Sequence, residues 1–170
     1  MSTDDHTPIL YPTRIDLPQE IRADIITLLN QTLVCTVDLR SQVKQAYWNV
    51  KGKDFIPLHA LFTTIVAVLD SYTDLMAERI AVLGGVAMGT VRMAATRSRL
   101  LEYPNTLTEG NDHVAALVER FAYYATVIRG GVTQAADVED AGSAAIYTDI
   151  SRGVDKQLWV LETYLQRKHT

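Results

Sequence analysis

The chain is organised around residues 59–85, which read HALFTTIVAVLDSYTDLMAERIAVLGG. Pro57 lies just before this stretch, the pair Gly84 and Gly85 closes it, and no other proline or glycine interrupts it. Proline at the start of a helix and glycine directly after its end are the usual boundary signals. The sequence therefore predicts one long, unbroken helix here.

Polar side chains that can bind metal ions form a stripe along one side of this predicted helix. At about 100° per residue the members of the stripe share one narrow arc, and they are His59, Thr63, Asp70, Asp74 and Glu78. The three carboxylates are like charges one turn apart, which costs a few tenths of a kcal/mol per pair. A bound metal ion would reverse the sign of this interaction.

The stripe is too long to bind one ion within a single chain. His59 and Glu78 lie nineteen positions apart, which is roughly 28 Å along a helix. If two copies of the helix ran antiparallel about a two-fold axis, His59 of one copy would come level with Glu78 of the other, and Thr63 with Asp74. The stripe therefore predicts a subunit interface that carries two identical sites.

Composition agrees with one helical domain. The chain has 170 residues, of which 48% are hydrophobic, and a net charge of -4, so it can bury a good core and has no electrostatic reason to bind nucleic acid. The single cysteine, Cys35, excludes an intrachain disulfide and is expected to be a buried, inert thiol. No signal-peptide pattern and no run of about 18 apolar residues is present, so we expect a cytoplasmic protein that does not bind membranes.

The remaining prolines and glycines, together with the helical spacing of apolar residues, divide the rest of the chain into further elements. We expect an extended arm over residues 1–15, followed by a helix from Asp16 to Val50, a long connection with a short helix at residues 91–98, a helix capped by Asn111, and a last helix from Ala144 to about Arg167. A connection this long is expected to span the length of the bundle. The predicted fold is all-α, a ferritin-like four-helix bundle with a long crossover carrying a short helix, over residues 16–170.

Five short motifs carry a resemblance to a known family. They are KQAYWNVKG at 44–52, FIPLH at 55–59, DLMAER at 74–79, LGG at 83–85 and DKQLWVLE at 155–162. In order and spacing they closely resemble the Dps family of mini-ferritins over nearly the whole chain. The resemblance implies a hollow homo-dodecamer that oxidises Fe(II) with hydrogen peroxide or oxygen at two-fold interfaces and stores ferric mineral inside. Some members of that family also bind DNA.

The resemblance also implies a ligand set, which this chain matches in part. Asp74 and Glu78 match the aspartate and glutamate that one subunit supplies, and His59 matches one of the two histidines from its neighbour. Tyr47 stands where the other histidine is expected, and Thr63 stands where an aspartate is expected. A phenolate can still bind Fe(III), whereas a neutral hydroxyl is a poor substitute for a carboxylate.

Counting ligands predicts one ion per site. His59, Asp74 and Glu78 suffice for one Fe(II), or for an adventitious Zn(II), with water completing the shell. Asp70 lies one turn before Asp74 and is predicted to act as an auxiliary carboxylate that partly compensates for Thr63.

Each of these residues also has an interpretation without metal. Asp74 and Glu78 could form a solvated helix face, His59 could be a structural interface residue, and Tyr47 could pack without ligation. Two functions therefore stay open, a cage that oxidises and stores iron and a cage of the same architecture that sequesters metal or is structural, without catalysis.

The resemblance places Asp140 and Asp149 beside the three-fold pores through which iron enters, although both could equally belong to a helix start and a solvated face. Trp48 and Trp159 are expected to anchor the core or an interface. DNA binding is not expected, because neither terminus carries a cluster of lysines. The remaining histidines show no ligand spacing and are expected to be exposed; they are His6, His113 and His169.

Overall fold

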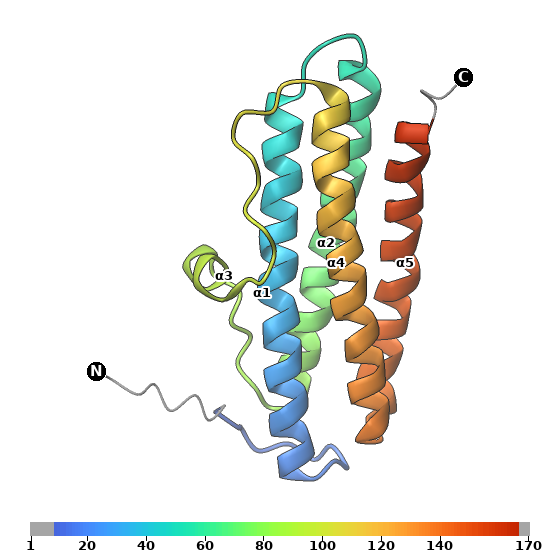
Figure 1. The fold of residues 1–170 in the computed structure, drawn as a ribbon. Helices are drawn as coiled ribbons and strands as arrows, with labels where there is room; N and C mark the ends of the chain where they lie inside the picture. The colour runs from blue at the N-terminus through green and yellow to red at the C-terminus, as the bar shows by residue number, and fades with distance from the viewer. Residues whose placement is uncertain (1–8, 167–170) are drawn as a thin grey trace.

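The computed structural model describes residues 9–166, and this part of the chain contains five helices and no strand. The helices are α1 (Gln19–Asn49), α2 (Phe55–Val82), α3 (Val91–Arg97), α4 (Gly110–Asp137) and α5 (Ala141–Gln166). The four long helices form a bundle, and the short α3 lies outside it beside α1 (Figure 1). The predicted all-α, ferritin-like bundle is confirmed.

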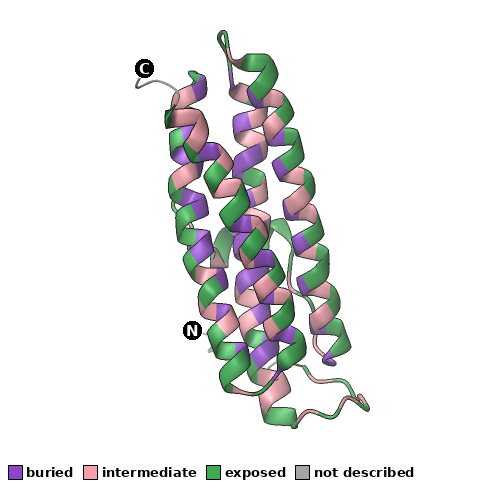
Figure 2. Ribbon diagram, turned by 90° about the vertical axis from the view of Figure 1, so that its right-hand side faces the viewer, coloured by how far each residue is buried: buried purple, intermediate pink, exposed green. Residues whose placement is uncertain are grey.

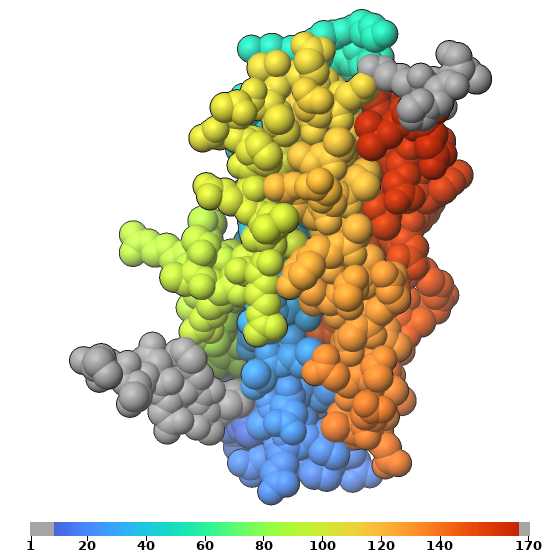
Figure 3. All heavy atoms as spheres, in the orientation of Figure 1, coloured from blue at the N-terminus to red at the C-terminus, as the bar shows by residue number. Residues whose placement is uncertain are grey.

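The long connection determines the topology of the bundle. α1 and α2 form one antiparallel pair, α4 and α5 form the other, and the connection between the pairs runs back along the whole bundle (Figure 1). In the space-filling view this connection lies across α1 on one face of the molecule (Figure 3). Because it returns the chain to the end where α2 began, α2 and α4 run in the same direction, as the predicted crossover requires.

Buried side chains from the bundle hold the crossover in place. The Gln42 amide donates to the Leu101 carbonyl at 3.0 Å, and the Arg120 guanidinium donates to the Glu102 carbonyl at 2.7 Å. Arg120 also donates to the Gln42 side chain at 3.1 Å and is only 5% exposed. These bonds satisfy carbonyl groups in the part of the crossover after α3, which has no helix or sheet of its own to pair them.

The core lies along the inner faces of the four long helices (Figure 2). It contains two large tyrosines with satisfied hydroxyl groups: Tyr124 lies 2.6 Å from the Thr36 hydroxyl, and Tyr147 lies 2.8 Å from the Thr32 hydroxyl. Cys35 is buried and free, as predicted.

The ends of α2 follow the sequence signals with a small shift. α2 begins at Phe55, so Pro57 lies inside the first turn, where a backbone N–H has no helical partner to lose. At the other end Gly84 adopts a φ of 85°, and the N–H groups of Gly84 and Gly85 donate to the carbonyls of Ala81 and Ile80 at 2.9 and 2.8 Å. This pair of bonds is the glycine-based Schellman ending of a helix.

Three predicted helix starts are wrong. α1 begins at Gln19, with Pro18 in the N-cap position, rather than at Asp16. α4 begins at Gly110 with Glu109 as its N-cap, so Asn111 lies within the first turn and caps nothing. α5 begins at Ala141 rather than Ala144, because the Asp140 carboxylate accepts a bond from the Ser143 N–H at 3.0 Å and caps the helix earlier. The predicted end at Arg167 lies outside the described residues.

Candidate metal site

One face of α2 is uncovered in the single chain. Its inner side chains are buried, whereas Thr63, Asp74 and Glu78 are exposed. Leu75 and Val82 are 41% and 50% exposed. Within the described residues α2 is the one helix that is long and apolar enough to cross a membrane, a test that the core helices of water-soluble proteins also pass. An apolar helix that is half covered by its own chain is typical of a subunit interface.

The predicted ligands do not meet within one chain. His59 lies in the second turn of α2, while Asp74 and Glu78 lie in its last three turns. Among the described residues no group of three or more histidine, cysteine, aspartate or glutamate side chains is placed to hold an ion. A metal site built from these three residues therefore requires a second copy of α2.

The surroundings of His59 fix the orientation of its ring. The Tyr47 ring, from the last turn of α1, stacks on His59 with centroids 3.9 Å apart and planes inclined by 28°. Phe55 contacts the same imidazole at 5.0 Å between centroids. The Lys44 ammonium lies over the Tyr47 ring, 4.0 Å from its centroid. Tyr47 therefore packs its face against the imidazole, an arrangement that positions His59 whether or not the phenol oxygen binds metal.

Thr63 uses its hydroxyl locally. Its side-chain oxygen donates to the His59 carbonyl one turn back, at 2.9 Å. The hydroxyl oxygen keeps lone pairs but brings no negative charge to the stripe. The carboxylate that the family resemblance would place here is therefore not replaced electrostatically by this residue.

Asp70 is paired across the bundle with a residue of α1. The Arg40 guanidinium donates through Nε to Asp70 Oδ1 and through Nη2 to Asp70 Oδ2, the latter at 3.3 Å. Both carboxylate oxygens are thus engaged by one cation. The predicted role of Asp70 as an auxiliary ligand must compete with this ion pair.

The two carboxylates that the resemblance placed near a pore have different surroundings. Asp140 is 2% exposed and accepts bonds from Arg79 at 2.7 Å and from the Ser143 hydroxyl at 2.5 Å. This burial favours the interpretation of Asp140 as a helix start. Asp149 is 69% exposed and pairs with the neighbouring Arg152 at 3.2 Å, so it is the better candidate for a pore.

His113 is buried, and the prediction that it is exposed is wrong. It is 1% exposed, and its Nδ1 atom lies 2.7 Å from the Tyr103 hydroxyl on the crossover. Burial lowers the pKa of His113. The helical period could have predicted this burial, since His113 lies one turn before the buried Leu117 on the same face of α4. His6 and His169 lie outside the described residues.

The two tryptophans do not lie in the core. Trp48 and Trp159 are 65% and 63% exposed, so of their two predicted roles only that of interface anchor is left. Trp159 lines a shallow apolar pocket with Leu61 and Tyr164, among others, where α5 packs beside α2.

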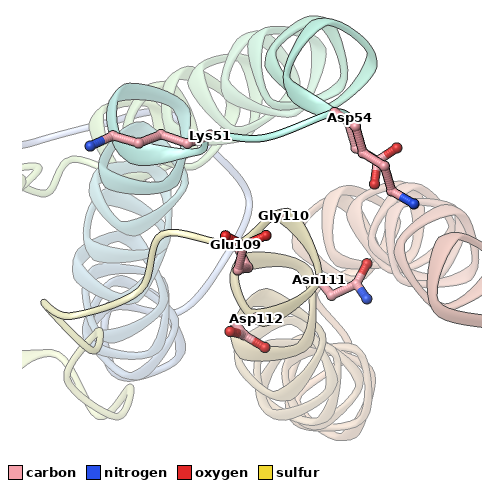
Figure 4. A pocket seen from close by; sticks show the side chains of 7 residues that line it. Lys51, Asp54, Glu109, Gly110, Asn111 and Asp112 are labelled. Atoms are coloured by element: carbon pink, nitrogen blue, oxygen red, sulfur yellow. The ribbon is translucent and has the colours of Figure 1, made fainter.

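A polar pocket of about 240 Å³ opens at the end of the bundle where α2 and α4 begin (Figure 4). Its charged lining consists of Lys51, Lys53, Asp54, Glu109 and Asp112. Ammonium and carboxylate groups are mixed there, so the pocket does not favour a ligand of either charge.

Known proteins resemble this chain over most of its length. A family model described as "Ferritin-like domain" matches residues 26–169. The chain is 37% identical over 158 residues to a "DNA protection during starvation protein" from Agrobacterium fabrum, covering 93% of this chain and 98% of that protein.

Solved structures agree with this similarity. DpsA14 from Streptomyces coelicolor has a TM-score of 0.88 at 25% identity, with 94% of each chain covered. The DPS protein from Vibrio cholerae O1, described as a member of a broad superfamily of ferritin-like diiron-carboxylate proteins, has a TM-score of 0.85 at 25% identity, covering 90% of this chain and 96% of that one.

Proposed function

This chain belongs to the Dps family of ferritin-like proteins, and from that membership we propose that it is a mini-ferritin that assembles into a hollow homo-dodecamer, binds and oxidises Fe(II) between subunits, and stores ferric iron inside. One observation carries the proposal: the candidate ligands lie at opposite ends of an uncovered face of α2 and form no site within the described part of one chain.

An antiparallel pairing of two α2 helices would complete the site. Glu78 of one subunit would then lie level with His59 of the partner subunit, and Asp74 would lie one turn away, level with Thr63 of the partner subunit. The same register places Phe55 opposite Val82, and these apolar side chains are 42% and 50% exposed in the single chain. Apolar contacts at both ends and polar ligands between them therefore support one and the same register.

The ligand chemistry suits one ion of Fe(II). An imidazole and two carboxylates are ligands that both Fe(II) and Zn(II) accept, so adventitious Zn(II) is expected to compete. Iron is here the substrate, and hydrogen peroxide or oxygen takes its electron. Tyr47 is close enough to His59 to contribute a phenolate after oxidation, although its ring face is used for stacking.

The second candidate function is a cage of the same architecture that sequesters metal without oxidising it. The observation that favours it is Thr63, whose hydroxyl is bonded to the His59 carbonyl and adds no charge to the site. Reduction of hydrogen peroxide to water takes two electrons, whereas one Fe(II) supplies one. A site with a single ion is therefore poorly suited to rapid oxidation unless two sites act together.

The remaining parts of the proposal concern transport, location and partners. Asp149, exposed on α5, is proposed to line the iron entry pore, and the protein is proposed to be cytoplasmic. DNA binding is not expected, because the net charge is -4. A plasmid gel-shift at neutral pH and moderate salt tests this, and retardation that disappears as salt rises would contradict it.

Three measurements test the proposal. Light scattering after size-exclusion chromatography should give the mass of a dodecamer, and a stable monomer at micromolar concentration would refute the assembly. Anaerobic calorimetric titration with Fe(II) should show that Glu78→Ala abolishes tight binding while the exposed control Glu20→Ala leaves it unchanged. If Glu78→Ala binds Fe(II) as tightly as the parent, the site lies elsewhere. Stopped-flow oxidation then separates the two candidate functions, since the non-catalytic cage oxidises Fe(II) no faster than buffer does.

A further inference from the structure

We propose that Arg40 keeps the candidate site to a single metal ion by holding Asp70 in an ion pair, away from the metal; this inference rests on the proposed function. Asp70 is the nearest carboxylate that could replace the charge missing at Thr63, because it lies one turn before Asp74 on the same stripe. Arg40 is therefore a positioning residue that acts through Asp70.

The geometry of the pair supports this role. The guanidinium of Arg40 comes from α1 and engages both oxygens of the Asp70 carboxylate. Such two-point contacts between arginine and a carboxylate fix the direction of the carboxylate as well as its position. A guanidinium bonded to both oxygens compensates the carboxylate charge and fixes its direction, which weakens its attraction for a metal ion.

The charge balance of the stripe leads to the same conclusion. Without Arg40, three carboxylates would follow one another at one-turn spacing along α2, and this much negative charge would attract a second cation. With Arg40 present, the charge of Asp70 is already compensated by a cation belonging to the protein. The guanidinium thus takes the place that a second, exchangeable metal ion would otherwise occupy.

The proposed pairing of two subunits explains why a cation is needed beside Asp70. In the antiparallel register, Asp70 and Asp70 of the partner subunit come within about 4.5 Å of each other along the axis. With so small an offset along the axis, two bare carboxylates on facing helices would repel each other across the interface. The side chains of Arg40 and Asp70 are 41% and 48% exposed in the single chain, so the pair is open to solvent until a second subunit covers it.

The test counts Zn(II) ions by calorimetric titration, because Zn(II) binds the same ligand types and has no redox chemistry. The parent and Asp70→Asn should each bind one Zn(II) per chain, with dissociation constants within twofold of each other. Arg40→Gln should bind a second, weaker Zn(II), and the double variant Arg40→Gln/Asp70→Asn should return to one. A purely structural role of Arg40 would not produce this gain and its reversal.

Two results would overturn the inference. One is a tenfold or greater loss of Zn(II) affinity in Asp70→Asn, which would show that Asp70 is a ligand in the parent. The other is an Arg40→Gln protein that assembles and still binds a single Zn(II). Where Arg40→Gln does not assemble, the Zn(II) affinity of Asp70→Asn decides whether Asp70 is a ligand. This variant lacks the repulsion between the two Asp70 carboxylates that Arg40 relieves, so it can assemble. Glu78→Ala separates the two proposals, because Zn(II) binding that survives it refutes the site itself.

Discussion

Two adjacent glycines in α4 should respond in opposite directions to the same substitution. An ideal Cβ at Gly131 would lie 2.6 Å from Cζ of Tyr147 and closer still to two other atoms of that ring, whereas ordinary contacts begin near 3.4 Å. The Tyr147 ring is fully buried and would have to retreat by about 1 Å. At Gly130 the nearest atom to an added Cβ is the end of the Gln134 side chain, at 3.7 Å.

The magnitude follows from three contributions. Overpacking of a well-filled core costs about 1 to 3 kcal/mol, and weakening the bond between Tyr147 and Thr32 costs about 1 kcal/mol more. Alanine gains about 1 kcal/mol over glycine in a helix interior. Gly131→Ala should therefore lower the free energy of unfolding by about 1 to 3 kcal/mol, while Gly130→Ala should leave it unchanged or raise it by up to about 1 kcal/mol.

Thermal unfolding at matched protein concentration measures both variants, since assembly makes the midpoint depend on concentration. For a chain of this size each kcal/mol shifts the midpoint by about 2 to 4 °C. A Gly131→Ala protein that melts at or above the midpoint of Gly130→Ala would refute the argument that the missing Cβ admits the Tyr147 ring.

Three further predictions concern residues away from the metal site. Burial holds the pKa of His113 below its usual value of 6.5, so below pH 6.5 the unfolded chain binds a proton that the folded chain does not. The free energy of unfolding should therefore fall as the pH drops from 6.5 towards the lower pKa of the folded state. Denaturant midpoints measured against pH should show this fall, and His113→Gln should flatten the pH dependence. Asp140→Asn should lower the free energy of unfolding by about 3 kcal/mol in the same assay, because it leaves the Arg79 guanidinium, 16% exposed, without its ion-pair partner. A loss under about 1 kcal/mol would contradict the structural role assigned to Asp140. Glu139 follows Val138, the C-cap of α4, and has a φ of 59°, a conformation that glycine adopts more easily. Glu139→Gly should therefore raise the thermal midpoint by about 1 to 3 °C, and a lower midpoint would contradict this argument.

Helix positions were largely predictable because their signals are local. The glycine pair after Leu83 supplies the left-handed residue that a Schellman ending needs, and the apolar period marks the inner face of each helix. The same logic failed at the start of α4, where Asn111 has the right residue type for a cap but Glu109 occupies the cap position. A cap depends on where the chain leaves its preceding loop, and the crossover sets that point.

The stripe on α2 was also predictable, because residues three and four apart on a helix share a face whatever the tertiary structure. From the sequence alone it follows that His59, Asp74 and Glu78 lie along one line and that a single chain cannot bring them together. The residue types further show that Thr63 cannot supply the missing carboxylate.

Only the tertiary structure decided what pairs with that stripe. Arg40 precedes Asp70 by thirty positions and lies on another helix, and whether they meet depends on the rotation and axial register of α1 against α2. The same holds for the partner of His113: its helix face follows from the sequence, but only the packed crossover brings the Tyr103 hydroxyl to its Nδ1 atom. Spacing along one helix determines which residues share a face. Contacts between helices depend on how whole faces pack against each other, which no short stretch of sequence determines.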